Sequence, residues 1–513
     1  FDHLSNESPQ TDLSSLPCST FIPDQEDLGQ LRSDFAILIA RVVVPVFPHF
    51  GFLKAVLPKH IKEENVTGLK EKNCVVPLPV LRKNEQKYTD VVDILDSYVS
   101  VIKDIYTQAG VEVPNSVHVG GDQLTRERFS GAKRLRSASL TEDEKCSILY
   151  PVAFELFHTE MALLTLFYQV LYSENSTDIG SLYSQKIRLN RRHADGKDVK
   201  NHYDSCIIEC VRSYFGFEDT QSSPTVNTTS VDTKASKKEI YTWMIHTFGK
   251  VVDEIIWKKS IEHIQRTQNQ PQYTQIFVPL SDGTLYTLTV PVTPTQQVLP
   301  SEEPDSVNLY AKNVLELGLL IKELHDIIHV PIRNRLLPCL KYLMLVFKGH
   351  NNRSKYALEI LRFLFHQTAI LSEKVTHESL YGLFVNTQGK IDSNIPADLE
   401  MEYQVRHTKD QLRAMCANKS YKSMSVGSSA FAGMQEISTY LSATLDVIVR
   451  YNRHNVPSSA EDEQLICKDL LDLKPGRRMS CMKVSKSPIT KLDMGHLFSW
   501  IESHKKTASY ELG

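Results

Sequence analysis

Apolar residues recur at helical spacing over two long parts of the chain. Two early segments each carry such a stripe, at Leu31, Phe35, Leu38 and Ile39 and again at Val91, Ile94, Leu95 and Tyr98. The same period predicts later helices over residues 307–328, 335–347, 355–371, 399–415 and 434–451. We therefore expect most of the chain to be helical.

The pattern changes between residues 111 and 219. Residues 117–121 resemble a short strand that ends on Gly120, Gly121 and the acid Asp122, and a second strand is predicted to begin near Ile148. A basic amphipathic helix is predicted between them, over residues 124–135, and an apolar helix follows the second strand. This succession of strand, helix, strand and helix predicts an α/β unit with a central mixed sheet enclosed by helices.

Two polar segments rich in Ser, Thr, Pro and Asp, residues 220–238 and 293–305, cannot bury a core. We predict that both are exposed, poorly ordered connections. Between them, β-prone runs at 273–280 and 284–292 flank Ser281-Asp282-Gly283, which predicts an inserted β-hairpin.

These patterns divide the chain into five segments. They are an N-terminal helical region (1–110), an α/β segment (111–219), a linker with the inserted hairpin (220–305), a second helical region (306–455) and a C-terminal tail (456–513). The chain begins at Phe1 without Met, so we expect it to be a fragment of a longer protein.

Composition narrows the possible partners only slightly. The 41% hydrophobic and 23% charged residues are ordinary for a globular protein, and the net charge of −3 means that any DNA-binding surface must be local. Nine scattered cysteines favour a reducing, intracellular compartment. Cys206 and Cys210 share a helix face without further ligands nearby, so packing explains them best. The apolar stretch 35–57 is broken by Arg41, Pro45 and Pro48, which argues against a membrane span.

Three longer blocks are similar to those of a transposon-derived family marked by a Gly-Asp-Gln-Leu-Thr signature. The first block covers residues 119–135 and contains Gly121-Asp122-Gln123-Leu124-Thr125. The second contains Phe157-His158 and Met161, and the third runs from Ile395-Pro396 through Asp398 to Glu402. The blocks occur in the family's order and span most of the chain.

The layout of this family resembles that of ribonuclease-H-like transposases of the hAT type. The resemblance implies an α/β, mostly helical fold: a ribonuclease-H-like core with extensive helical additions and an inserted hairpin. By analogy, Asp122 and Glu402 would be metal-binding carboxylates and His158 the histidine after the next strand. Mg²⁺ would be the cofactor, because two such ions bridge the attacking and leaving oxygens in phosphodiester cleavage.

The same resemblance implies a path for DNA beside the acids. Basic residues could contact phosphates there, on the first-block helix and on the helix of Glu402: Arg126, Lys133, Arg134, Arg406 and Lys409. A solvated basic face is the alternative explanation for the first three residues.

Each candidate site residue also has a structural explanation. Asp122 could be a helix N-cap, His158 a hydrogen-bonded core histidine, and Glu402 one half of an i,i+4 pair with Arg406. A first carboxylate should precede Asp122, but upstream acids lie on a predicted helix, and Glu155 is only a weak substitute. The sequence therefore predicts an incomplete active site.

Three functions stay open at this stage, and the third is an all-helical interaction scaffold without a nucleic-acid role, which the predominance of helix allows. The first is a transposase-derived protein with ancestral metal-dependent DNA cleavage and strand transfer, incomplete or inactive in this chain and expected in the nucleus. The second is a non-enzymatic scaffold that binds DNA or protein and retains the transposase-like fold, possible as a homo-oligomer. The missing first acid and the near-neutral charge favour the second function.

Overall fold

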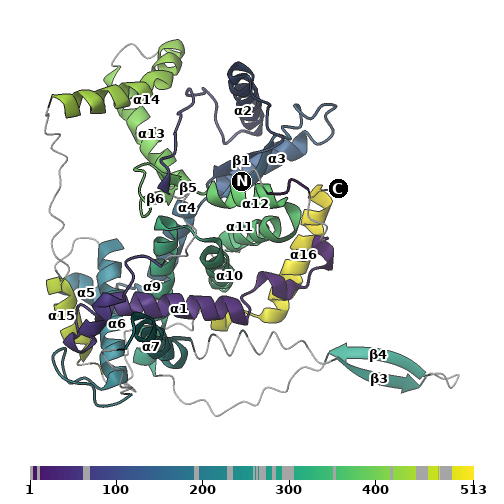
Figure 1. Ribbon diagram of the computed structural model, residues 1–513. Helices are drawn as coiled ribbons and strands as arrows, with labels where there is room; N and C mark the ends of the chain where they lie inside the picture. The colour runs from purple at the N-terminus through teal and green to yellow at the C-terminus, as the bar shows by residue number, and fades with distance from the viewer. Residues whose placement is uncertain are drawn as a thin grey trace.

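Helices dominate the computed structural model of the protein, and the strands are short (Figure 1). The structure describes residues 4–7, 12–61, 70–189, 196–227, 235–257, 260, 264, 273–279, 285–291, 305–350, 354–415, 420–445, 460–471, 473 and 488–512. The expectation of a mostly helical chain is confirmed.

The elements before the hairpin follow the predicted order. They are α1 (Gln25–Val43), α2 (Tyr88–Ala109), β1 (Val117–Gly121), α3 (Gln123–Leu135), β2 (Leu149–Phe154), α4 (Leu156–Leu171), α5 (Leu182–Arg188), α6 (Gly196–Phe215) and α7 (Lys237–Val251). Short 3-10 helices, η1 (Leu13–Ser15), η2 (Cys18–Phe21) and η3 (Pro48–Ala55), flank α1, and a π-helical turn, η5 (Val252–Trp257), continues α7. Capping boxes begin α1 at Asp24 and α7 at Ser236.

The later elements are again mainly helices. They are β3 (Tyr273–Pro279), β4 (Leu285–Pro291), α9 (Ser306–His329), α10 (Arg333–Lys348), α11 (Ser354–Phe365), the π-turn η7 (His366–Ile370), α12 (Glu373–Tyr381), β5 (Phe384–Asn386), β6 (Asn394–Pro396), α13 (Ala397–Ala414), α14 (Tyr421–Thr444), α15 (Ala460–Leu471), η8 (Ile489–Lys491) and α16 (Met494–Leu512).

The predicted α/β unit is present, but its sheet is smaller than expected. β1 and β2 pair in parallel, with Gly120 opposite Ala153 and Gly121 opposite Phe154, and α3 forms the crossover between them. Within the described residues the strands form three separate two-stranded sheets. The predicted central mixed sheet is therefore not observed in the described part of the chain, where helices α3 and α11 pack on β2.

The inserted hairpin is confirmed. β3 pairs with β4 in an antiparallel register, with Ile276 opposite Leu288. The predicted turn at residues 281–283 lies outside the described residues. So do most of the connection predicted over 293–305 and part of that over 220–238. In the described part of the latter, Thr225 N donates to Phe215 O, which joins this segment to the end of α6.

One large apolar core joins distant parts of the chain. It runs from Leu13 near the N-terminus to Ile501 in α16, and all five sequence segments contribute buried side chains to it. A smaller core lies between α2 and α3, where Val91 and Leu95 meet Phe129 and Ala132. In the main core the Trp257 ring packs at a tilt against two other rings, with its centroid 5.1 Å from that of Phe35 and 5.5 Å from that of Tyr342.

A buried ion cluster crosses this core. Arg335 on α10, only 3% exposed, contacts Asp34 on α1 at 3.3 Å and Glu323 on α9 at 2.9 Å. Burial raises the pKa of Glu323 well above its usual range, although the charge of Arg335 acts in the opposite direction. The cluster thus ties three central helices together through one guanidinium group.

In the described part of the chain, no helix combines the length and the apolar character needed to cross a membrane.

Candidate functional site

Acidic residues follow both strands of the parallel pair. Asp122 comes directly after β1 and Glu155 directly after β2, and Gly121 lies opposite Phe154 in the register. Because carboxyl ends of parallel strands meet at the same edge, these two acids lie at one end of the sheet. Helix α4 begins there with His158 in its first turn, and the start of α13 packs against α4.

Asp398 in the first turn of α13 binds the start of α4. Its buried carboxylate accepts hydrogen bonds from the backbone N–H groups of Phe157 and His158, both at 3.0 Å, and contacts His158 Nδ1 at 2.8 Å. The positive end of a helix favours such an anion. An acid on one helix therefore caps another helix whose start lies far away in the sequence.

Three carboxylates influence the His158 imidazole. The hydrogen bond to Asp398 raises the pKa of His158, partial burial opposes it, and the charges of Asp398, Asp122 and Glu402 raise it further. Asp122 and Glu402 thus lie near the same histidine, although they belong to different sequence blocks. The charges of Asp122 and Glu402 thus reach His158, and Asp398, which sequence reasoning did not select, is the acid that contacts its ring directly.

Asp122 serves as a helix cap. Its Oδ1 accepts a hydrogen bond of 2.7 Å from Thr125 N at the start of α3. The N-cap explanation from the sequence is therefore confirmed for this residue. It leaves a metal role for the same carboxylate as a proposal.

Glu402 lies one turn after Asp398 on α13, so both carboxylates lie on the same side of the helix. Its side chain is exposed, and in the described part of the chain it forms no ion pair with Arg406. The i,i+4 pair that the sequence offered as an alternative is therefore not observed. Glu402 stays available to the cluster around His158.

Glu155 is the most deeply buried acid at this end of the sheet. Burial raises its pKa well above the usual range, and the nearby charge of Asp398 raises it further. Its Oε2 is buried and has no hydrogen-bond partner among the described residues. A Cβ added at Gly120 would come within 1.4 Å of Glu155 Oε1, so the glycine on β1 provides the space for this acid.

Sequence reasoning undervalued Glu155 and missed Asp398. A glycine pair at the end of one strand beside an acid at the end of the next was the available signal for Glu155. For Asp398 the available signal was its place four residues before Glu402, which puts both acids on one side of a helix. Pro396, the N-cap of α13, marks where that helix begins.

The cluster matches Mg²⁺ in ligand type but not in arrangement. Carboxylate oxygens are suitable ligands, and the unpartnered buried oxygen of Glu155 is the kind of group that a cation would satisfy. However, the described residues contain no group of three His, Cys, Asp or Glu side chains placed to hold a metal ion. Asp122 and Asp398 instead accept hydrogen bonds from helix N-termini.

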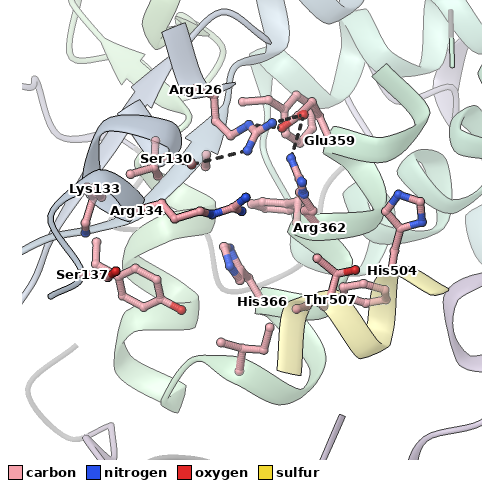
Figure 2. A pocket seen from close by; sticks show the side chains of 18 of the residues that line it. Arg126, Ser130, Lys133, Arg134, Ser137, Glu359, Arg362, His366, His504 and Thr507 are labelled. Atoms are coloured by element: carbon pink, nitrogen blue, oxygen red, sulfur yellow. Dashed lines mark hydrogen bonds and ion pairs between the residues drawn. The ribbon is translucent and has the colours of Figure 1, made fainter. Parts of the chain in front are cut away.

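The predicted DNA-binding residues separate into two groups. Arg126 is buried and ion-paired with Glu359 on α11, and Lys133 Nζ donates to Leu149 O at 2.7 Å. Arg134 lines a cavity beside them. The basic side of α3 therefore faces β2 and α11, where Arg126 pairs with Glu359 (Figure 2) and Lys133 donates to the Leu149 carbonyl group. Arg406 and Lys409 are exposed on α13.

Comparison with known proteins identifies a family. A sequence model described as a family of unknown function (DUF6589) matches residues 12–454. The chain therefore belongs to this family. No curated protein and no solved structure matches the chain.

Proposed function

We propose that this family member derives from a metal-dependent DNA transposase with a ribonuclease-H-like core, and that its acid cluster is the incomplete remnant of the catalytic site. The observation that supports this proposal is the position of Asp122 and Glu402, which both raise the pKa of His158. The unit of β1, α3 and β2, with acids after both strands, is compatible with part of such a core. The protein would act on DNA in the nucleus.

In the ancestor, Asp122 and Glu402 would be ligands of Mg²⁺, which would supply charge stabilisation at the attacking and leaving oxygens. In this chain Asp122 and Asp398 have structural partners instead, and Glu155 is buried. Asp122 caps α3, Asp398 caps α4, and burial keeps Glu155 biased toward its neutral form. An exposed Glu402 with Arg406 and Lys409 on the same helix is the part that could still face a DNA strand.

A nicking assay tests the incompleteness of the site. Supercoiled plasmid is incubated with the purified chain and either Mg²⁺ or Mn²⁺, and we expect no cleavage above that of the Glu402→Gln variant. Robust cleavage that disappears in Asp122→Ala would contradict this part of the proposal, because it would show a complete site.

Residual metal binding tests the ancestry of the site. We expect weak Mn²⁺ binding, detected by electron paramagnetic resonance as loss of the free-ion signal, and at least a several-fold weakening in Glu402→Gln. Glu436→Gln on α14 is a matched control, because this acid is exposed and lies on another helix. Equal binding by both variants, or none by the wild type, would argue against a metal-site remnant.

A non-enzymatic scaffold is the second candidate function, and α14 favours it. Figure 1 shows α14 at the far end of α13. Its exposed apolar side chains recur at helical spacing: Val426, Met434, Ile437, Leu441 and Leu445. Lys422 and Glu436 are the only charged residues of the helix, so two copies could pair their apolar sides without charge repulsion.

The occupant that we infer for this surface is a second copy of the chain. Light scattering coupled to size exclusion should then give a dimer that dissociates in Ile437→Glu with Leu441→Glu. Lys422→Glu on the same helix is the control for added negative charge. A wild-type chain that stays monomeric at high concentration would remove the self-association and leave another protein as the partner to seek.

A further inference from the structure

Two histidines lie one turn apart at the end of α9, a helix that carries none of the acids around His158. His325 and His329 are four residues apart, so their side chains lie on the same side of the helix. Their Nε2 atoms are 3.3 Å apart, and their rings stand at 87° to each other. Each imidazole therefore directs the same ring nitrogen toward the other.

This separation matches that of two ligands of one metal ion. Imidazole nitrogens bind Zn²⁺ at about 2.0–2.1 Å, and two such ligands of a tetrahedral ion are then about 3.3 Å apart. A hydrogen bond between the two rings is the competing explanation. The distance of 3.3 Å lies just beyond the range of about 2.7–3.2 Å in which N–H groups usually contact their acceptors. The pair thus already has the spacing that a shared ion requires.

A carboxylate on α4 contacts the outer nitrogen of His325. Glu160 Oε1 lies 3.1 Å from His325 Nδ1, and α4 packs against α9. Because an ionised carboxylate only accepts hydrogen bonds, the proton of the ring lies on Nδ1, and a neutral ring then has its lone pair at Nε2. Histidines that bind metal ions almost always donate their second ring nitrogen to such an acceptor. Glu160 therefore favours the tautomer of His325 that a metal ion requires.

The backbone beneath the pair is fixed, while the pair itself is open to solvent. Most residues of α9 are buried, and the backbone carbonyl group of His329 accepts a hydrogen bond of 3.0 Å from Asn394 Nδ2. The side chain of His325 is 61% exposed, so an ion can reach it from water. Since the helix is already ordered, binding would restrict only two side chains, and little affinity would be lost to ordering.

The ligand type selects a class of metal ion. Imidazole suits Zn²⁺, Cu²⁺ and Ni²⁺, whereas carboxylate and water oxygens suit Mg²⁺. In the described part of the chain, no third His, Cys, Asp or Glu side chain joins the pair to form a larger group placed to hold a metal ion. A structural zinc site is closed by four protein ligands. With two protein ligands, the other positions would be filled by water, and the ion would exchange with the solvent.

We propose that His325 and His329 bind a divalent transition-metal ion of the Zn²⁺ class through their Nε2 atoms, with Glu160 as a positioning residue. The site is independent of the transposase ancestry, because it uses nitrogen ligands and none of the acids around His158. The ion would join the last two turns of α9 and, through Glu160, support the contact between α9 and α4. An ion that binds only the folded chain also stabilises it against unfolding.

Calorimetric titration of the full chain with ZnCl₂ tests the proposal at about pH 7.5, where imidazole is mostly neutral. We expect one ion per chain at this site, at least 10-fold weaker binding in His325→Gln and in His329→Gln, and no displacement by excess Mg²⁺. His496→Gln is the matched control. This histidine is 90% exposed and lies 3.7 Å from a carboxylate, that of Asp493, but the sequence has no histidine four residues away from it.

Substitution of Glu160 and NMR provide further readouts. Glu160→Ala should weaken Zn²⁺ binding by about 10-fold or more, and Glu160→Gln by less, because an amide oxygen still accepts the hydrogen bond from Nδ1. Zn²⁺ should shift the imidazole NMR signals of His325 and His329 but not those of His496. Equal Zn²⁺ affinity in the wild type and in both histidine variants would overturn the proposal. A wild-type chain that binds no Zn²⁺ would also overturn it and leave the pair as two hydrogen-bonded rings.

Discussion

His158 is the residue at which the separate sequence blocks meet. Asp398 on α13 contacts its Nδ1 at 2.8 Å, and the charges of Asp122 after β1 and Glu402 on α13 raise its pKa. An imidazole in such surroundings is held in its charged form more strongly than one in water. Its titration therefore measures how closely the three carboxylates approach.

The first prediction concerns this titration. The pKa of His158, measured by NMR, should lie above the usual value of about 6.5 and should fall most in Asp398→Asn. Asp122→Asn and Glu402→Gln should each lower it by a smaller amount, because their charges act without a hydrogen bond. Asp410→Asn, on the exposed part of α13, is the control. If neither Asp122→Asn nor Glu402→Gln shifts the titration, the acids do not converge.

The sign of the pH dependence follows from the same shift. Because the folded-state pKa of His158 is raised, its contribution to stability is fully present below about pH 6.5, the unfolded value, and is lost as pH rises through the folded pKa. In Asp398→Asn the largest part of this contribution is lost, and the caps of the Phe157 and His158 amides weaken. We expect a loss of about 1–3 kcal/mol at pH 6, measured by urea unfolding.

The second prediction concerns Glu155. Its raised pKa means that folding is penalised as pH rises above the unfolded value of about 4.3, because the folded state must keep a proton or bury a charge. Glu155→Gln should remove this pH dependence and raise the free energy of unfolding at pH 7, because a neutral amide has no proton to lose. Gly120→Ala, which places a methyl group against the Glu155 side chain, should destabilise the protein. A Glu155→Gln variant that is less stable at pH 7 would indicate an ionised, partnered carboxylate.

At the scale of elements, the helices and strands were accessible from sequence because local periodicity specifies them. The pattern around Val117 predicted β1, and the apolar runs beside residues 281–283 predicted β3 and β4. The size of the sheet was not accessible, since strand neighbours depend on contacts between distant segments. The direction of α3 was also missed: Arg126 and Lys133 resemble a solvated face, and only the position of Glu359 and Leu149 shows that they point inward.

The third prediction tests how elements are tied together. Arg335 joins α1, α9 and α10 through buried acids, and removal of one partner from such a cluster leaves uncompensated charge. Arg335→Met should therefore lower the free energy of unfolding by about 3–5 kcal/mol. Arg413→Gln, whose surface pair with Asp410 is exposed, should change it by less than about 1 kcal/mol. Comparable effects of the two substitutions in urea unfolding would contradict the role of the buried cluster.

At the scale of the whole molecule, the five sequence segments share one continuous core. The boundary positions predicted from composition mark changes of pattern, but buried residues from Leu13 to Ile501 pack into a single cluster. Sequence periodicity identifies which face of each helix is apolar. It does not identify which distant helix covers that face, so the joining of the two ends of the chain appears only in the structure.

The last prediction follows from this shared core. Ile501 is fully buried on α16, and Trp257 packs against Phe35 and Tyr342 in a part of the core built by α1, α10 and η5. Ile501→Ala should cost about 2–5 kcal/mol through lost burial and the remaining cavity. If the core unfolds as one unit, the loss must also lower the unfolding midpoint that Trp257 reports.

The measurement uses a chain in which Trp243 and Trp500 are replaced by Phe, so that fluorescence comes from Trp257. Far-ultraviolet circular dichroism is recorded on the same samples. Both signals should move by the same amount of denaturant, whereas Leu140→Ala, at a side chain that is 95% exposed, should move neither. The contrary result is a Trp257 transition with an unchanged midpoint, beside a circular dichroism curve that shows an additional transition at lower denaturant. That result would show that α16 unfolds separately, because destabilising one part of a cooperative core lowers the stability of the whole core.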